Sequence, residues 1–196
     1  PAPLPPTRTA EFPIQRADGS VHWVACDSHA HTLPNGTIVH NGFWMDITAR
    51  KEVEARTQAV FRHAPLALLF YRPDAGILRC NPSAIRLFGG QQEADLLGRQ
   101  PWSDLSVSEQ DSAARQAIDE IHAQHQTRTL DWRFQPLHGE PFDAEVVLIA
   151  FKHNGQTQYC AILQNITARK QADVALRQAQ AASEAATEAK TRFLAN

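Results

Sequence analysis

The sequence has little of what marks disulfide-bonded, membrane or nucleic-acid-binding proteins. It holds only three cysteines, Cys26, Cys80 and Cys160, and no two of them have C-x-x-C spacing. An odd number without that spacing favours reduced thiols over a disulfide framework. There is no run of about 18 apolar residues that could span a membrane. A formal net charge of −2 gives no reason to expect a nucleic-acid or membrane surface.

Catalytic signatures are also missing. The sequence contains no glycine-rich phosphate loop followed by Lys-Ser/Thr and no nucleophile elbow. We therefore expect no catalytic residue in this chain. What the chain does have is apolar material, 43% of 196 residues. That is enough for one domain of about 100 residues with flanking elements.

An internal repeat is the most informative positive feature. Asp46-Ile-Thr-Ala-Arg-Lys51 returns 119 residues later as Asn165-Ile-Thr-Ala-Arg-Lys170. This motif and two pairs of turns recur in the same order. Together these three markers predict a tandem array of one module, whose first copy begins part-way through. Because the chain also starts at a proline, we expect it to be a piece of a longer protein. The two other markers are turns: Asn35-Gly36 and Asn154-Gly155 at the same offset, and Asp18-Gly19 and His138-Gly139 at an offset one residue larger.

Hydrophobic periodicity and turn residues predict the elements of both copies. Residues 11–47 are expected to form three strands, joined by Asp-Gly and Asn-Gly hairpin turns. A helix is expected over 49–62, with Val53, Thr57, Val60 and Phe61 on one stripe. The complete copy should then contain strands over 66–71 and 77–80, short helices over 82–88 and 92–97, a longer helix behind Ser108, and three closing strands.

The strand over 142–151 is apolar on both faces. Phe142, Val146 and Leu148 lie on one face, and Val147 and Ile149 lie on the other. Such a strand needs cover on both sides. Small helices can cover one side, and the 49–62 helix or a second subunit can cover the other.

The order of elements and several short motifs together resemble the PAS domain. The resemblance implies an α+β fold: a five-stranded antiparallel sheet with helices on one face, flanked by an N-terminal helix and a C-terminal coiled-coil helix. The motifs are Cys80-Asn-Pro-Ser-Ala84, Leu87-Phe-Gly89, Leu96-Leu-Gly98, Gly139 and Asn165-Ile-Thr167. The domains expected from it are the C-terminal half of a preceding PAS repeat over 1–48, a connecting helix over 49–64, a complete PAS domain over 65–167 and a signalling helix over 168–196.

The tail carries a second resemblance. Ala189-Lys-Thr-Arg-Phe-Leu-Ala-Asn196 is similar to the opening of the dimerisation and phosphoacceptor domain of sensor histidine kinases. This implies a cytoplasmic relay region of a bacterial two-component system. The parent would be an ATP-dependent histidine kinase, a transferase and phosphoprotein, with a response regulator as partner and an inner-membrane anchor left open. The alternatives are a PAS docking module without ligand, or PAS input to a cyclic-dinucleotide enzyme.

The helix between the two resemblances is rich in alanine. A seam of small residues spaced by three or four predicts a weak homodimeric coiled coil, because alanine knobs bury little area. The alternative is a solvated helix, since alanine favours helix without any partner. The seam consists of Ala172, Ala175, Ala179, Ala182, Ala186, Ala189 and Phe193.

The closing motif of the repeat is the expected site of signal coupling. By the PAS resemblance, Asn165, Thr167 and Arg169 should tie the last strand to the outgoing helix. The family usually has Asp-Ile-Thr there, as at Asp46. Asn165 can still form hydrogen bonds, but the charge-assisted contribution is lost.

Cofactor chemistry is disfavoured by the residues at the relevant positions. Gln110 stands where haem-binding relatives carry an axial histidine, and it cannot replace an imidazole ligand. A flavin photoadduct needs an Asn-Cys-Arg context, whereas Cys80 precedes Asn81. We expect Cys80 to be a small core residue, with a redox thiol of helix-lowered pKa as the alternative. Cys160 is also expected in the core.

A histidine cluster in the first copy could ligate zinc, although we favour an exposed hairpin without metal. It consists of His22, Cys26, His29, His31 and His40.

An organic-ligand pocket or a filled core therefore remains for the complete copy. The pocket residues expected from the fold are Phe70, Leu78, Cys80, Asn81, Phe88, Trp102, Gln110, Ile118, Phe134, Leu148 and Ile162.

Overall fold

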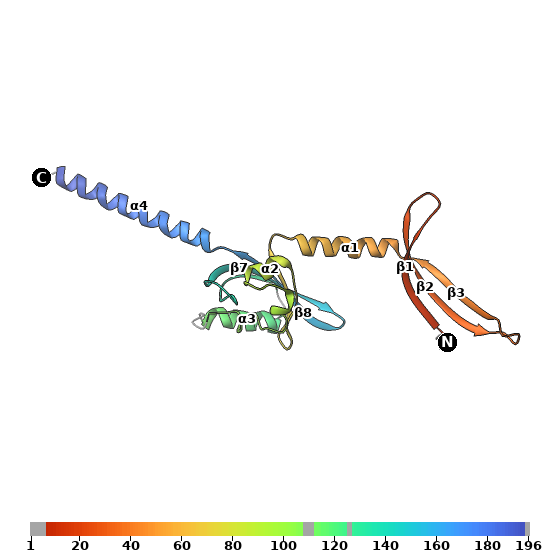
Figure 1. Cartoon of the computed structure of the whole chain (residues 1–196). Coiled ribbons are helices and arrows are strands. Elements are labelled where there is room, and N and C mark those ends of the chain that lie inside the picture. Colours follow the sequence, from red (N-terminus) through yellow and green to blue (C-terminus); the bar gives the residue numbers. More distant parts are fainter. Residues whose placement is uncertain (1–6, 108–111, 125–126, 195–196) are drawn as a thin grey trace. The chain divides into compact units, whose positions relative to one another are not determined.

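The computed structural model describes residues 7–107, 112–124 and 127–194 (Figure 1). The chain divides into two compact units, residues 1–60 and residues 61–196. No helix in these described ranges is both long enough and apolar enough to cross a membrane.

The first unit is built on a three-stranded antiparallel sheet. Its strands are β1 (Thr7–Gln15), β2 (Val21–Thr32) and β3 (Ile38–Asp46), in that spatial order. Helix α1 (Thr48–His63) follows directly, one residue longer at each end than the sequence predicted. No residue of α1 is buried.

The second unit is a five-stranded antiparallel sheet with helices, as the PAS resemblance implied. The strand order is β5-β4-β8-β7-β6. The elements are β4 (Ala67–Arg72), β5 (Gly76–Cys80), α2 (Pro82–Leu87), η1 (Glu93–Asp95), α3 (Ser112–Gln124), β6 (Arg128–Phe134), β7 (Phe142–His153), β8 (Gln156–Asn165) and α4 (Thr167–Leu194).

One predicted helix is shorter than expected. The segment 92–97 forms only the single 3₁₀ turn η1. The Asp95 carboxylate accepts the backbone N–H groups of Gln91 and Gln92 and so fixes the start of this turn. Gly98 then takes a left-handed φ of +76° and donates its N–H to the carbonyl of Ile77, which turns the chain back to β5.

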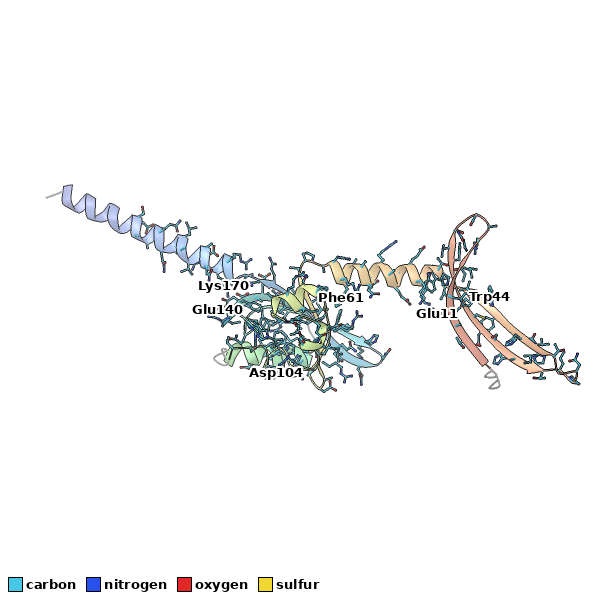
Figure 2. The ribbon with its side chains drawn as sticks, viewed as in Figure 1. Glu11, Trp44, Phe61, Asp104, Glu140 and Lys170 are labelled. Carbon is cyan, nitrogen blue, oxygen red and sulfur yellow. The ribbon has the colours of Figure 1, made fainter. Side chains whose placement is uncertain are left out.

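The core of the second unit lies on one face of the sheet, where the side chains are crowded (Figure 2). Each large apolar side chain buried there stabilises the fold by about 1.5–3 kcal/mol relative to exposure. The largest fully buried side chains are Trp132, Tyr71, Tyr159, Phe88, Phe134, Leu69, Ile77, Leu96, Leu105, Ile121, Leu148 and Leu163.

The opposite face of this sheet is also apolar, but its side chains are only half-buried. Phe70 of β4 contacts Phe151 of β7, with ring centroids 5.8 Å apart. Phe61, in the last turn of α1, packs on Phe70 at 5.7 Å, and the Arg79 guanidinium lies over the Phe61 ring. Phe61, with which the second unit begins, therefore covers part of the outer face at β4.

The first sheet matches the last three strands of the second sheet residue for residue. Cys26 lies opposite Ala10 and Trp44, and Val146 lies opposite Leu130 and Leu163 in the same register. The offset is 120 residues in β1 and β2 but 119 in β3.

One hairpin explains that change of offset. In the first unit three residues separate Leu33 from Thr37, whose backbone groups are hydrogen-bonded. In the second unit two residues separate the paired His153 and Gln156. The extra residue at the hairpin tip accounts for the one-residue difference between the repeat markers.

Candidate functional site

The site that the repeat points to is the joint between β8 and α4. The Asn165 side-chain Oδ1 accepts the backbone N–H of Thr167 at 2.9 Å. Thr167 Oγ1 in turn accepts the backbone N–H of Asp143, at the start of β7, at 2.9 Å. Ile166 donates its N–H to the Asp143 carbonyl at 2.8 Å, and its side chain is 2% exposed. The first turn of α4 is thus fastened to a strand other than the one that leads into it.

The first copy forms the same joint between β3 and α1. Asp46 Oδ1 accepts the Thr48 N–H at 2.9 Å, and Thr48 Oγ1 accepts the Trp23 N–H at 2.9 Å. Ile47 donates its N–H to the Trp23 carbonyl at 2.8 Å. Trp23 and Asp143 occupy corresponding positions in their strands, so the motif has the same geometry in both units.

The two joints differ in charge. Asp46 also accepts the Thr48 hydroxyl at 2.6 Å, and its other oxygen contacts His22 and Arg16 at 2.9 and 3.3 Å. The Thr48 hydroxyl and N–H, followed by His22, hold the pKa of Asp46 well below its ordinary value. The neutral Asn165 amide cannot replace these charge-assisted contacts. The Thr167 hydroxyl lies 3.5 Å from the Asp143 carbonyl instead.

An ionic clasp adds to each joint through the last residue of the repeated motif. Lys170 Nζ contacts Asp131 of β6 at 2.9 Å and Asp143 of β7 at 3.4 Å, and Asp131 is the main cause of the raised pKa of Lys170. In the first unit, Lys51 Nζ contacts Glu11 of β1 at 2.7 Å. Glu11 and Asp131 occupy corresponding positions in the matched strands.

The arginine before each of these lysines also pairs with a carboxylate. Arg169, which the sequence singled out, contacts Glu145 of β7 at 3.4 Å, while Arg50 contacts Glu11 at 2.6 Å. Lys170, Asp131 and Asp143 were not predicted from the sequence. The repeat carried a usable signal, because each copy has a lysine after the arginine and a carboxylate in the middle of the third strand from the end.

A hollow lies between the end of the sheet and the start of α4, next to the joint. Beyond the joint, α4 makes little contact with the sheet, since residues 171–184 are exposed throughout. A shift at this end of the sheet would therefore reach α4 mainly through its first turn. The hollow is lined by Arg133, Glu140, Pro141 and Asp143 of the sheet end and by Thr167, Lys170, Gln171, Val174, Ala175 and Gln178 of α4.

The predicted ligand-pocket residues divide between two faces of the sheet. Phe70 and Ile162 face away from the core. The prediction that they line one pocket together with the other residues is therefore wrong. Leu66–Tyr71 is apolar at every position, and alternation alone could not show that Leu69 and Tyr71 are the inward residues. Cys160, also expected in the core, lies beside Phe70 on the outer face. Gln110 lies outside the described residues, and Leu78 is half-buried in β5. The residues placed in the core are Cys80, Asn81, Phe88, Ile118, Phe134 and Leu148, with Trp102 packed against its rings.

Aromatic rings fill much of this core. The Tyr71 and Tyr159 rings stack with centroids 5.4 Å apart, and Trp102 packs edge-on against Trp132 at 5.2 Å. The Tyr71 hydroxyl lies 2.8 Å from His122 Nε2, and burial raises the pKa of Tyr71. His122 of α3 therefore points inward and is held by a tyrosine, a contact that the sequence did not reveal.

Asn81 and Cys80, two of the predicted pocket residues, are both buried in this core. Asn81 Oδ1 accepts the N–H groups of Ala84 and Leu68, and its Nδ2 donates to the Leu66 carbonyl. It therefore caps α2 and ties it to β4. Cys80 is 4% exposed, and burial, followed by the nearby Glu93, raises its pKa to about 12. The alternative of a thiol activated by the helix is therefore wrong.

Metal binding has no support in the described ranges. There, no three histidine, cysteine, aspartate or glutamate side chains come close enough together to hold a metal ion.

Comparison with known proteins decides the family. A family model described as PAS domain matches residues 65–168, just over half of the chain. The chain belongs to the PAS domain family. The matched segment begins just before β4 and ends in the first turn of α4, so it contains the complete sheet of the second unit and its joint.

Solved structures share this fold at low sequence identity. An RNA-binding Light-Oxygen-Voltage receptor is 14% identical, with a TM-score of 0.54, over 89% of this chain and 82% of its own. The Rhodobacter sphaeroides LOV protein is 21% identical (TM-score 0.50; 59% and 68% covered). A PAS domain from Colwellia psychrerythraea is 18% identical (TM-score 0.50; 59% and 98% covered). At these identities the likeness concerns the fold alone. No curated protein matches the chain.

Proposed function

We propose that this PAS sensory domain is the cytoplasmic relay region of a sensor histidine kinase. A change in the PAS core or in the incoming α1 would bias a pair of outgoing α4 helices and so control autophosphorylation. The observation that carries the relay is the joint at Thr167. Backbone bonds, a buried isoleucine and the Lys170 clasp hold the first turn of α4 on β7.

The helices on either side of the domain favour a homodimer. Along α4 the alanines of the predicted seam from Ala172 to Ala182 are exposed, as is Leu176 at 58%. Along α1, Val53 and Val60 lie one heptad apart and are 63% and 67% exposed. A second copy would cover both stripes. An alanine seam is weak, so a few kcal/mol from upstream could change its register or order.

The kinase assignment rests on the tail motif, whose last two residues lie outside the described ranges. That motif argues against the alternative in which the domain feeds a cyclic-dinucleotide enzyme. The strand-for-strand match of the two sheets supports the prediction that residues 1–48 are the C-terminal half of a preceding PAS repeat.

The ring-filled core favours a relay without ligand over a ligand sensor. Native mass spectrometry of gently purified protein separates the two. A copurified small molecule at stoichiometric occupancy would contradict the ligand-free form.

A helix-breaking substitution tests the relay directly. Ala179→Pro in the full-length protein should abolish stimulus-dependent autophosphorylation, because proline in a helix interior costs about 3 kcal/mol and removes a backbone bond. Ala179→Ser is the matched control, since serine stays small at the seam and costs less than about 1 kcal/mol in a helix. A normal response from the proline variant would overturn the relay.

A further inference from the structure

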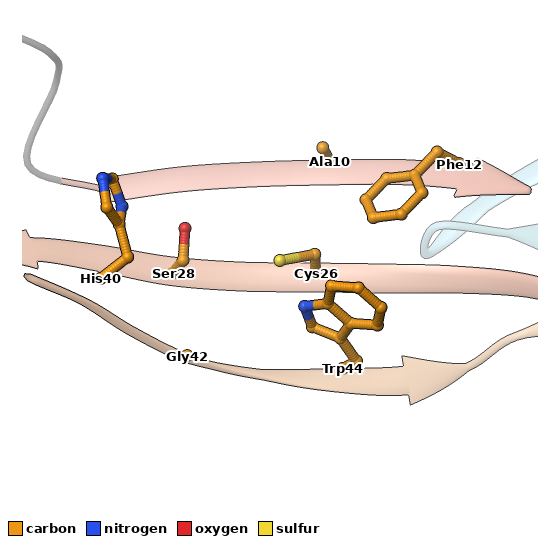
Figure 3. Close-up of a pocket in the computed structure, with 7 residues that line it drawn as sticks. All are labelled: Ala10, Phe12, Cys26, Ser28, His40, Gly42 and Trp44. Carbon is orange, nitrogen blue, oxygen red and sulfur yellow. The ribbon is translucent and has the colours of Figure 1, made fainter. Parts of the chain in front are cut away.

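The first sheet carries a hollow on the face opposite Trp23 (Figure 3). Phe12 and Trp44 form one end of it, with ring centroids 5.6 Å apart in an edge-on arrangement. The Trp44 side chain is 62% exposed, which is unusual for so large an apolar group. The residues lining the hollow are Ala10, Phe12, Cys26, Ser28, His40, Gly42 and Trp44.

Every lining residue of this hollow has a counterpart in the core of the second unit. The matched register makes Phe12 the counterpart of Trp132 and Trp44 the counterpart of Leu163. Except for the partly buried Leu130, all these counterparts are at most 2% exposed. In chain order of the hollow, they are Leu130, Trp132, Val146, Leu148, Tyr159, Ala161 and Leu163.

The first sheet also has an unpaired edge strand where the second sheet has a paired one. β8 pairs with β7 on one side and with β4 on the other. Its counterpart β3 pairs with β2 alone among the strands that the structure describes. An unpaired edge and an exposed apolar face on one strand both need a partner.

We propose that this face is the floor of a second PAS core. Its occupant is the first half of a module of the same kind, carried ahead of β1 on the same polypeptide. A strand of that half would pair with the free edge of β3, as β4 pairs with β8. Short helices would cover Phe12 and Trp44, as α2 and α3 lie over the second sheet. The inference depends on the strand correspondence and not on the kinase assignment.

The floor also defines what its cover must look like. Ser28 and Gly42 are paired across β2 and β3 and stand where the second unit has Leu148 and Ala161. Both are smaller than their counterparts. To reach native packing density, the covering helices must place larger apolar side chains over this pair than the second unit needs.

Cysteine alkylation tests the proposal, because Cys26 lies in the hollow and each unit supplies its own thiols. N-ethylmaleimide labelling of each cysteine is followed by mass spectrometry in the 196-residue chain and in the polypeptide extended ahead of Pro1. Cys26 should label at least about tenfold more slowly in the extended form, because reaction then requires local opening. Cys80 and Cys160 should label at the same rates in both.

Three results would overturn the proposal. One is an equal labelling rate of Cys26 in the two polypeptides. Another is protection of Cys26 in the 196-residue chain that increases with concentration, which would make a second copy the occupant. The third concerns Trp44 in the extended polypeptide. Trp44→Asp should restore fast labelling of Cys26 while Trp44→Phe should not, and continued protection in the aspartate variant would contradict the proposed cover.

Discussion

The two sheets of this chain end in the same joint, but only the second has a covered core. Thr48 and Thr167 accept corresponding backbone N–H groups at 2.9 Å, although Trp44 is 62% exposed and its counterpart Leu163 is 1% exposed. The joint therefore depends on the closing motif and two neighbouring strands. The core depends on elements far away in the sequence. A joint that forms without a complete core is suited to repetition along an array.

The second difference between the copies lies within the joint. Asp46 places a carboxylate among Thr48, His22 and Arg16, whereas Asn165 is neutral. Both joints have a lysine clasp, but only in the second does the lysine contact carboxylates of two strands, because Lys170 lies between Asp131 and Asp143. Helix α4 is thus held by a lysine that contacts two strands. Helix α1 is held by its own lysine and also by the Asp46 carboxylate at the end of β3.

The largest expected effect separates the two cores. Leu163→Ala should destabilise the second unit by about 2–5 kcal/mol, because it leaves a cavity in a packed core. Trp44→Ala, at the corresponding exposed position, should cost the first unit less than about 1 kcal/mol. Urea unfolding of each variant, followed by circular dichroism, measures both. Equal losses would mean that Trp44 is already covered in this chain.

Local patterns sufficed to predict the elements of both units, except that the helix expected over 92–97 is only the turn η1. Asp-Gly, Asn-Gly and helix-ending glycines mark the turns. Alternation of apolar and polar residues marks β6, which has one solvent-exposed face and turns Trp132 and Phe134 inward. Alternation failed where strands are apolar on both faces. Phe70 and Ile162 were placed inside for this reason, although the buried positions of β4 and β8 are the ones that alternate with them.

The contacts of the site were harder to predict than its position. The repeated motif located the joint and named Asn165, Thr167 and Arg169. It could not show that Thr167 binds the start of β7, because that contact joins residues 24 positions apart. Burial of Cys80 was predicted, but the direction of its pKa shift was not, since desolvation outweighs any effect of the nearby helix.

A moderate effect is expected at the clasps. Lys170→Met should cost the second unit about 0.5 kcal/mol, since the lysine is 42% exposed and exposed ion pairs contribute little. Lys51→Met should have a similar effect on the first unit. Unfolding at low and at high salt provides the measurement, because salt screens exposed pairs. A loss that persists unchanged in about 1 M salt would show that Lys170 acts through packing instead.

The smallest effect concerns the charge at the first joint. The pKa of Asp46 is lower in the folded chain than its ordinary value of 3.8, so its stabilisation is complete above that value. This stabilisation is lost as the pH falls below about 4. The stability difference between wild type and Asp46→Asn should therefore shrink on acidification. Asn165→Asp should give the second joint an acid sensitivity of the same sign but smaller, because Phe142 stands where the first unit has His22. A pH-independent difference for Asp46→Asn would contradict the assignment.

Hydrogen exchange on Thr167→Val tests the coupling of sheet and helix most directly. Valine keeps the shape but removes the acceptor of the Asp143 N–H. The Asp143 amide and the amides of the first turn of α4 should all exchange about tenfold faster or more, because losing this bond costs about 1–3 kcal/mol. In Thr167→Val, the amides at the corresponding joint around Thr48 should keep their exchange rates. In the control variant Val174→Ala, the Asp143 amide and the first turn of α4 should keep theirs. If only the Asp143 amide became faster while the first turn of α4 kept its protection, the sheet and the helix would not be coupled through Thr167.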